Sequence, residues 1–122
     1  MQPANALNTL SALRLAVGAG SWFTPRLAGR LFGIDAKANP QSPYLARLFG
    51  ARDLALAVGA KQSTGEARRL WLQAGLACDL ADAVAGAAAG GKGYLPRHAA
   101  VMATVTAVAA AALGAAVLAG DL

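Results

Sequence analysis

The chain has few charged residues, few aromatic residues and a single cysteine. Only 14% of its 122 residues are charged and 6% are aromatic, whereas 57% are hydrophobic. A soluble domain of this length needs more polar side chains to cover its surface, so the composition favours a membrane protein. The lone Cys78 excludes an internal disulfide and any metal site built from several cysteines.

Acidic residues are outnumbered by basic residues, six to eleven, which gives a formal net charge of +5. Such an excess can indicate nucleic-acid binding. Here the basic residues lie in loops and at the ends of apolar runs, without interleaved aromatic residues. We therefore expect membrane lipids around the protein and no nucleic-acid partner. No nucleotide-binding loop, cofactor motif, metal-ligand cluster or catalytic constellation is evident, so we expect no cofactor, no metal and no catalytic residue.

Four apolar segments are each long enough to cross a hydrocarbon core of about 30 Å at about 1.5 Å per helical residue. The sequence thus predicts an all-α protein with one domain over residues 1–122. The expected transmembrane helices cover residues 4–23, 43–60, 67–89 and 96–119. A short amphipathic helix over residues 25–33 is expected to lie on the membrane surface, with Arg26 and Arg30 on one face.

The ends of these segments carry interfacial and capping signals. Ser63-Thr64-Gly65-Glu66 matches a capping box and predicts the start of the third span. Lys and Arg are more frequent in the loops 24–42 and 90–97, which predicts that these loops face the cytoplasm. The expected location is therefore a bacterial inner membrane, crossed several times. Aromatic residues expected at the two membrane interfaces are Trp22, Tyr44, Tyr94 and Trp71.

Charged residues also occur near the middle of three of these spans, namely Arg14, Arg52, Asp53, Asp79 and Asp82. A lone charge at the bilayer centre costs at least about 2.5–3.5 kcal/mol, so these residues should pair. We expect Arg14 to pair with one of the two aspartates of the third span and Arg52 with the other, while Asp53 shares Arg14. Arg47 lies about one turn in from its helix end and is expected to snorkel to the interface. Counted with it, three arginines balance three aspartates.

This charge network has two interpretations. It fixes the order and register of the helices, or it forms a path for protons or ions. The first is favoured because a relay needs a titratable group poised against its neighbours, and the one histidine, His98, lies at the loop–helix boundary of the last span.

The last apolar segment contains no charged residue in its interior and many small residues. Transmembrane helices associate by close packing of small side chains, so this segment is expected to dock onto a partner. The residues predicted to form that packing surface are Ala103, Ala107, Ala110 and Gly114.

Four short motifs carry a resemblance to a known family. Leu10-Ser-Ala-Leu-Arg-Leu15, Thr24-Pro-Arg-Leu27, Leu31-Phe-Gly-Ile-Asp35 and Leu48-Phe-Gly-Ala-Arg-Asp53 resemble small, uncharacterised four-helix membrane proteins of actinobacteria. The resemblance implies a four-helix architecture in a bacterial inner membrane and no established chemistry. The chain is also similar in size to an accessory membrane subunit of the mycobacterial multi-subunit lipid importers.

These observations favour an accessory subunit that docks through its helices onto a larger inner-membrane complex, with a lipid transporter as the candidate partner. Two alternatives remain open. The protein is a small stand-alone transporter or channel that uses the arginine–aspartate network, or it is a small membrane enzyme that acts on a lipid or a quinone.

Overall fold

The computed structural model describes residues 2–120, which form five α-helices and no strands. The helices are α1 (Pro3–Phe23), α2 (Pro25–Leu31), α3 (Ser42–Gln62), α4 (Gly65–Gly91) and α5 (Arg97–Ala119). No helix end lies more than two residues from the boundary expected from the sequence. The prediction of an all-α fold is therefore confirmed.

Proline and glycine mark most of the helix ends. A proline occupies the first turn of α1, α2 and α3, where its missing N–H costs nothing. The capping box predicted at residues 63–66 is wrong. Ser63 donates its hydroxyl hydrogen bond backwards to the carbonyl oxygen of Gly59 at 2.6 Å, and Thr64 precedes α4 without a side-chain cap. Ser63 therefore closes the end of α3 and does not start α4.

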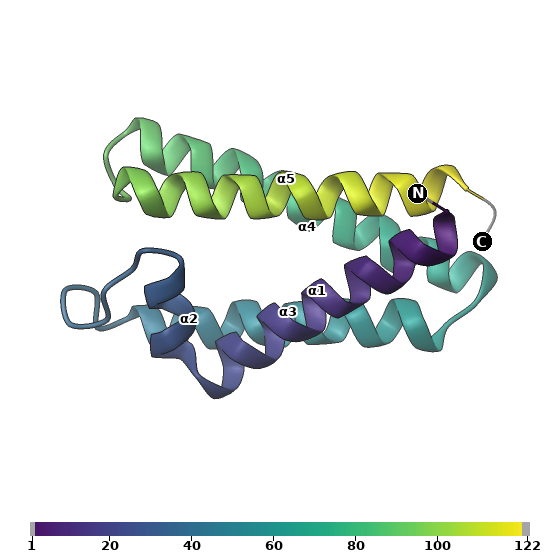
Figure 1. Ribbon diagram of the computed structural model, residues 1–122, viewed down its shortest axis with the longest axis horizontal. Coiled ribbons are helices and arrows are strands. Elements are labelled where there is room, and N and C mark those ends of the chain that lie inside the picture. Colours follow the sequence, from purple (N-terminus) through teal and green to yellow (C-terminus); the bar gives the residue numbers. More distant parts are fainter. Residues whose placement is uncertain (1, 121–122) are drawn as a thin grey trace.

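The four long helices form an up-down-up-down bundle (Figure 1). Helix α1 pairs most extensively with α3, and α4 with α5, while α1 also contacts α5 and α3 contacts α4. Helices α1 and α4 therefore lie diagonally across the bundle. The connections on either side of α2 and between α4 and α5 lie at one end, which we call the loop end. The α3–α4 turn and the two ends of the described chain lie at the opposite end, the terminal end.

Each of the two helix pairs crosses on small residues. A Cβ atom at Gly50 on α3 would lie 2.6 Å from the carbonyl oxygen of Gly18 on α1. In the other pair, a Cβ atom at Gly86 would lie 2.8 Å from the hydroxyl oxygen of Thr104. The α1–α3 pair therefore depends on close backbone approach, whereas at Gly86 the neighbour that fills the space is the Thr104 side chain.

The apolar core lies in the terminal half of the bundle, where all four long helices meet. Its buried members are Ala6, Leu7, Leu10, Ala60, Leu72, Ala110 and Val117. This placement corrects the surface predicted for a partner, because Ala107, Ala110 and Gly114 are buried inside the bundle and Ala103 is half-buried. Helix α5 uses its small residues to approach α1 and α4. Its outward face carries the exposed side chains of Val101, Val105 and Val108.

Among the described residues, one helix, Arg97–Ala119, is long and apolar enough by composition to cross a membrane. This differs from the expected four spans. The reason is that α1, α3 and α4 carry charged side chains together with polar residues and glycine, which lower their average hydropathy. Whether these three helices could cross a membrane therefore depends on where their charged side chains lie in the bundle.

Candidate functional site: a buried arginine–aspartate network

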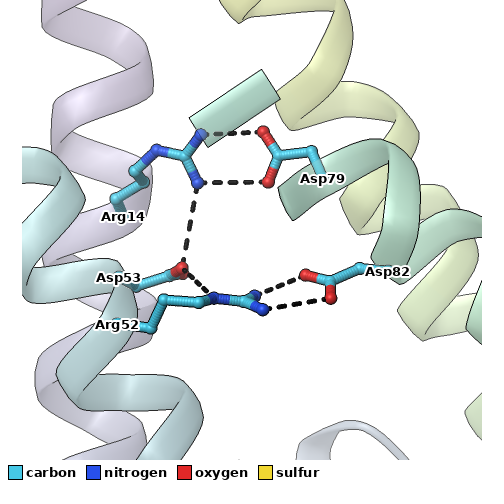
Figure 2. A network of polar contacts seen from close by, with 5 residues as sticks. All are labelled: Arg14, Arg52, Asp53, Asp79 and Asp82. Atoms are coloured by element: carbon cyan, nitrogen blue, oxygen red, sulfur yellow. Dashed lines mark hydrogen bonds and ion pairs between the residues drawn. The ribbon is translucent and has the colours of Figure 1, made fainter. Parts of the chain in front are cut away.

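All five charged residues predicted near the middle of the helices meet between α1, α3 and α4 (Figure 2). Helix α1 supplies Arg14, and α3 supplies the adjacent Arg52 and Asp53. Asp79 and Asp82 are three residues apart on α4, so they lie on one face of that helix. Neighbouring residues on a helix point about 100° apart, which directs Arg52 and Asp53 toward different partners.

Arg14 and Asp79 form the more deeply buried ion pair, which we call the inner pair. Arg14 donates from Nη1 to Oδ1 of Asp79 at 3.1 Å and from Nη2 to Oδ2 at 2.7 Å. The two side chains are only 6% and 5% exposed. Because α1 and α4 are diagonal neighbours, the guanidinium group crosses the centre of the bundle. Gly75 makes room for it, since a Cβ atom there would lie 2.7 Å from Nη2.

Arg52 and Asp82 form a second bidentate ion pair, which we call the outer pair. Arg52 donates from Nη1 to Oδ1 of Asp82 at 3.2 Å and from Nη2 to Oδ2. The side chains are 33% and 31% exposed. The guanidinium carbon of Arg52 also lies 4.7 Å from the centre of the Phe49 ring, within the range of a cation–π contact. The outer pair thus joins the neighbouring helices α3 and α4.

Asp53 lies between the two pairs (Figure 2). Its Oδ1 is 3.8 Å from Nη1 of Arg14 and 3.9 Å from Nε of Arg52, which are ion-pair distances without a hydrogen bond. Within residues 2–120, this buried Oδ1 and the buried Nε of Arg52 have no hydrogen-bond partner. Asp53 therefore adds a negative charge near both arginines but links neither of them by a hydrogen bond.

The expected balance of three arginines and three aspartates is wrong. Arg47 is exposed near the loop end, where its Nε donates to the carbonyl oxygen of Trp22 at 3.1 Å. A long side chain within about a turn of the helix end reaches the surface instead of the interior. The interior then holds two guanidinium groups and three carboxylates, which sum to a formal charge of −1.

The residues predicted at the interfaces lie near the two ends of the bundle. Trp22, Tyr44 and Tyr94 are exposed toward the loop end, and Trp71 lies toward the terminal end with its ring against Gly59. Arg26 and Arg30 are exposed on α2 at the loop end. Their role at a membrane interface stays a prediction.

Two uncharged residues also take part in the site: Gly75, which the sequence already places on the helix face of Asp79 and Asp82, and Phe49, which sequence reasoning missed. Gly75 lies one turn before Asp79 on the same face of α4, and Phe49 lies three residues before Arg52. Helical spacing alone indicates both, because residues three or four apart share a face. No group of three or more potential metal ligands occurs within residues 2–120. The arrangement is suited to locking three helices in one register.

Comparison of the chain with family models, with curated proteins and with solved structures finds no match. The resemblance to small actinobacterial membrane proteins therefore stays a prediction that rests on the quoted motifs.

Proposed function

We propose that this protein is a multi-pass helical bundle of the bacterial inner membrane and an accessory subunit of a larger membrane complex. The observation that carries the proposal is an inverted distribution of polarity. Charged side chains lie between the helices, and apolar side chains lie on the outside at the same level. Water-soluble helices have the opposite arrangement, with their apolar stripe facing inward.

The outer surface at the level of the network is apolar on every long helix. Within residues 10–23, 48–60, 74–91 and 99–119, each exposed residue is Ala, Gly, Leu, Val, Trp or Phe. We call this zone the apolar belt. At about 1.5 Å per residue, it extends along the helices for about 20 to 32 Å, compared with about 30 Å for a hydrocarbon core. Soluble proteins rarely expose continuous apolar surface on this scale.

Helix α5 supports the same conclusion. A highly apolar helix in a soluble protein is normally a buried core helix. In α5, only 28% of the most apolar stretch is buried within the bundle. Lipid or another membrane protein is the natural cover for the remainder.

The accessory role is supported by the use of the charged groups. Arg14 and Arg52 each engage one carboxylate through two hydrogen bonds, which favours a structural network over a conducting one. The outward face of α5, with Val101, Val105 and Val108, then offers a smooth surface to a larger partner. The resemblance described above favours a lipid importer as that partner.

The membrane placement is tested by alkaline extraction of bacterial membranes, from which an integral protein is released only by detergent. The accessory role is tested by co-purification in mild detergent. Val105→Trp should abolish recovery of the partner while the variant still inserts. Val58→Trp is the matched control, because Val58 is a similarly exposed valine on α3. Recovery of the complex with Val105→Trp at the wild-type level would exclude the α5 face as the interface.

A stand-alone transporter is the second candidate, and one observation favours it. Asp53 has a buried oxygen without a hydrogen bond, and it adjoins an outer pair that is about one-third exposed. Purified protein in liposomes would be assayed for proton and cation flux. Flux that Asp53→Asn abolishes would favour the transporter; a stoichiometric large partner without flux would favour the accessory subunit.

A further inference from the structure

A second group of charged residues lies outside the network, in a cleft at the loop end. Helix α2, the following loop and the start of α3 surround a volume of about 660 Å³. Arg26, Arg30 and Lys37 line this cleft together with Asp35. Its remaining wall is largely apolar and includes Ile34 and Pro43. The cleft therefore combines positive charge with an apolar lining.

The three basic side chains are available to a ligand. Among residues 2–120, none of them donates a hydrogen bond or forms an ion pair. The one acidic group, the Asp35 carboxylate, accepts a hydrogen bond at 3.1 Å from the backbone N–H of Lys37. Three cations and one carboxylate leave a formal charge of +2 in the cleft. An anion is the ligand that complements it.

Backbone contacts hold the cleft in shape. The N–H of Ile34 donates to the carbonyl oxygen of Gly29 at 2.8 Å, and that of Gly33 donates to Arg30 at 3.0 Å. Gly33 has φ +82°, a conformation that suits glycine and turns the chain back along α2. A Cβ atom at Gly33 would also lie 2.6 Å from the His98 ring, which shows how closely this loop approaches α5. These backbone contacts hold the loop that carries Lys37 against α2, which carries Arg26 and Arg30.

The surface beside the cleft is apolar. Leu27 and Leu31 on α2 are exposed, as is Tyr44 at the start of α3. An amphipathic helix with this composition lies in the interface, with its leucines toward the acyl chains and its arginines at the level of the headgroups. A ligand that satisfies both surfaces has an anionic head and an apolar tail.

We propose that this cleft binds the phosphate group of an anionic phospholipid. Arg26 and Arg30, four residues apart on α2, provide paired guanidinium donors, and Lys37 provides a third positive charge from the facing loop. The acyl chains extend along Leu27 and Leu31 into the apolar belt. This inference goes beyond the accessory role and rests only on the membrane placement.

The test uses the purified full chain in neutral detergent, with native mass spectrometry and thermal unfolding as readouts. The probes are short-chain phosphatidylglycerol, short-chain phosphatidylcholine and inorganic phosphate. Phosphatidylglycerol should bind and raise the unfolding temperature, whereas the other two should have little effect. The double variant Arg26→Gln, Arg30→Gln should weaken phosphatidylglycerol binding by roughly tenfold or more.

The matched control is Lys92→Gln, Arg97→Gln, which removes the same charge at the loop end but outside the cleft. The control should bind phosphatidylglycerol like the wild type. An equal loss in both double variants, or no loss in the Arg26, Arg30 double variant, would overturn the cleft as a specific site. Equal binding of inorganic phosphate would identify a general anion site instead of a lipid site. Release from membranes at alkaline pH would contradict the membrane placement separately, because the binding assay is made in detergent.

Discussion

The inner and outer ion pairs have the same chemistry and opposite surroundings. Each consists of an arginine that donates two hydrogen bonds to one aspartate of α4. The inner pair is about 95% buried and connects the diagonal helices α1 and α4, whereas the outer pair is about one-third exposed and connects neighbours. In the inner pair, Gly75 on α4 leaves space for the guanidinium group of Arg14.

This difference separates two roles for charge in one bundle. A buried pair adds little net stability compared with an apolar replacement, but loss of one partner is costly because the other charge remains buried. A partly exposed pair costs less to break, because the charge that remains can snorkel or draw in water and headgroups. We therefore expect the inner pair to fix the register of α1 against α4, and the outer pair to contribute less to the register of α3 against α4.

The largest effect is expected from breaking the inner pair. Asp79→Ala leaves the Arg14 guanidinium buried without its two acceptors, so the free energy of unfolding should fall by about 3–5 kcal/mol. The measurement is unfolding by sodium dodecyl sulfate in dodecyl maltoside micelles. The double variant Arg14→Met, Asp79→Leu removes both charges and should recover most of the loss. A double variant as unstable as the single variant would show that packing, and not an orphaned charge, is responsible.

A smaller effect is expected from Gly75→Ala. The added methyl group would lie 2.7 Å from Nη2 of Arg14, so the guanidinium must shift and its hydrogen bonds to Asp79 must lengthen. Overpacking of this kind costs about 1–3 kcal/mol in the same unfolding assay. Gly20→Ala on α1 is the matched control, because a Cβ atom there meets nothing within 4 Å. Equal stability of the two variants would mean that Arg14 relaxes without cost.

Breaking the outer pair should have a still smaller effect. Asp82→Ala leaves Arg52 stacked on Phe49 and with the carboxylate of Asp53 3.9 Å from its Nε, so the charge is not left alone and we expect a loss of about 1 kcal/mol. The same assay, run beside Asp79→Ala, gives the comparison directly. A loss for Asp82→Ala that equals the loss for Asp79→Ala would show that the membrane or a partner buries the outer pair as deeply as the inner pair.

The helix boundaries and the pairs of the network were accessible from the sequence, because apolar run length, proline position and midspan charge each have a direct physical meaning. Arg14 had two candidate aspartates, and their one-turn separation on α4 left the choice to the crossing geometry of diagonal helices. The role of Gly75 follows from that same geometry.

Other predictions were wrong because the sequence does not show which element a residue faces. The small residues of α5 suit an interface with a partner as well as they suit packing inside the bundle, and the structure places Ala107, Ala110 and Gly114 inside. Ser63 and Glu66 have the spacing of a capping box, yet the serine hydroxyl bonds back to α3. The expected zero balance of charge was wrong because it included Arg47. The prediction that Arg47 reaches the helix end is confirmed by its hydrogen bond to the carbonyl oxygen of Trp22.

The smallest effect on the free energy of unfolding is expected from substitutions of Asp53. Its Oδ1 makes no hydrogen bond, and its two arginine neighbours are 3.8 and 3.9 Å away and already engaged by other carboxylates. Asp53→Asn keeps the shape, removes the unmatched formal charge and loses only two long ion-pair contacts. We therefore expect a change in unfolding free energy of less than about 1 kcal/mol in either direction. Asp53→Leu is the control, because it keeps a similar branched shape but removes the polar atoms as well as the charge. A loss for Asp53→Asn comparable with that for Asp79→Ala would contradict the division into two pairs, because it would make Asp53 the group that holds both arginines in place.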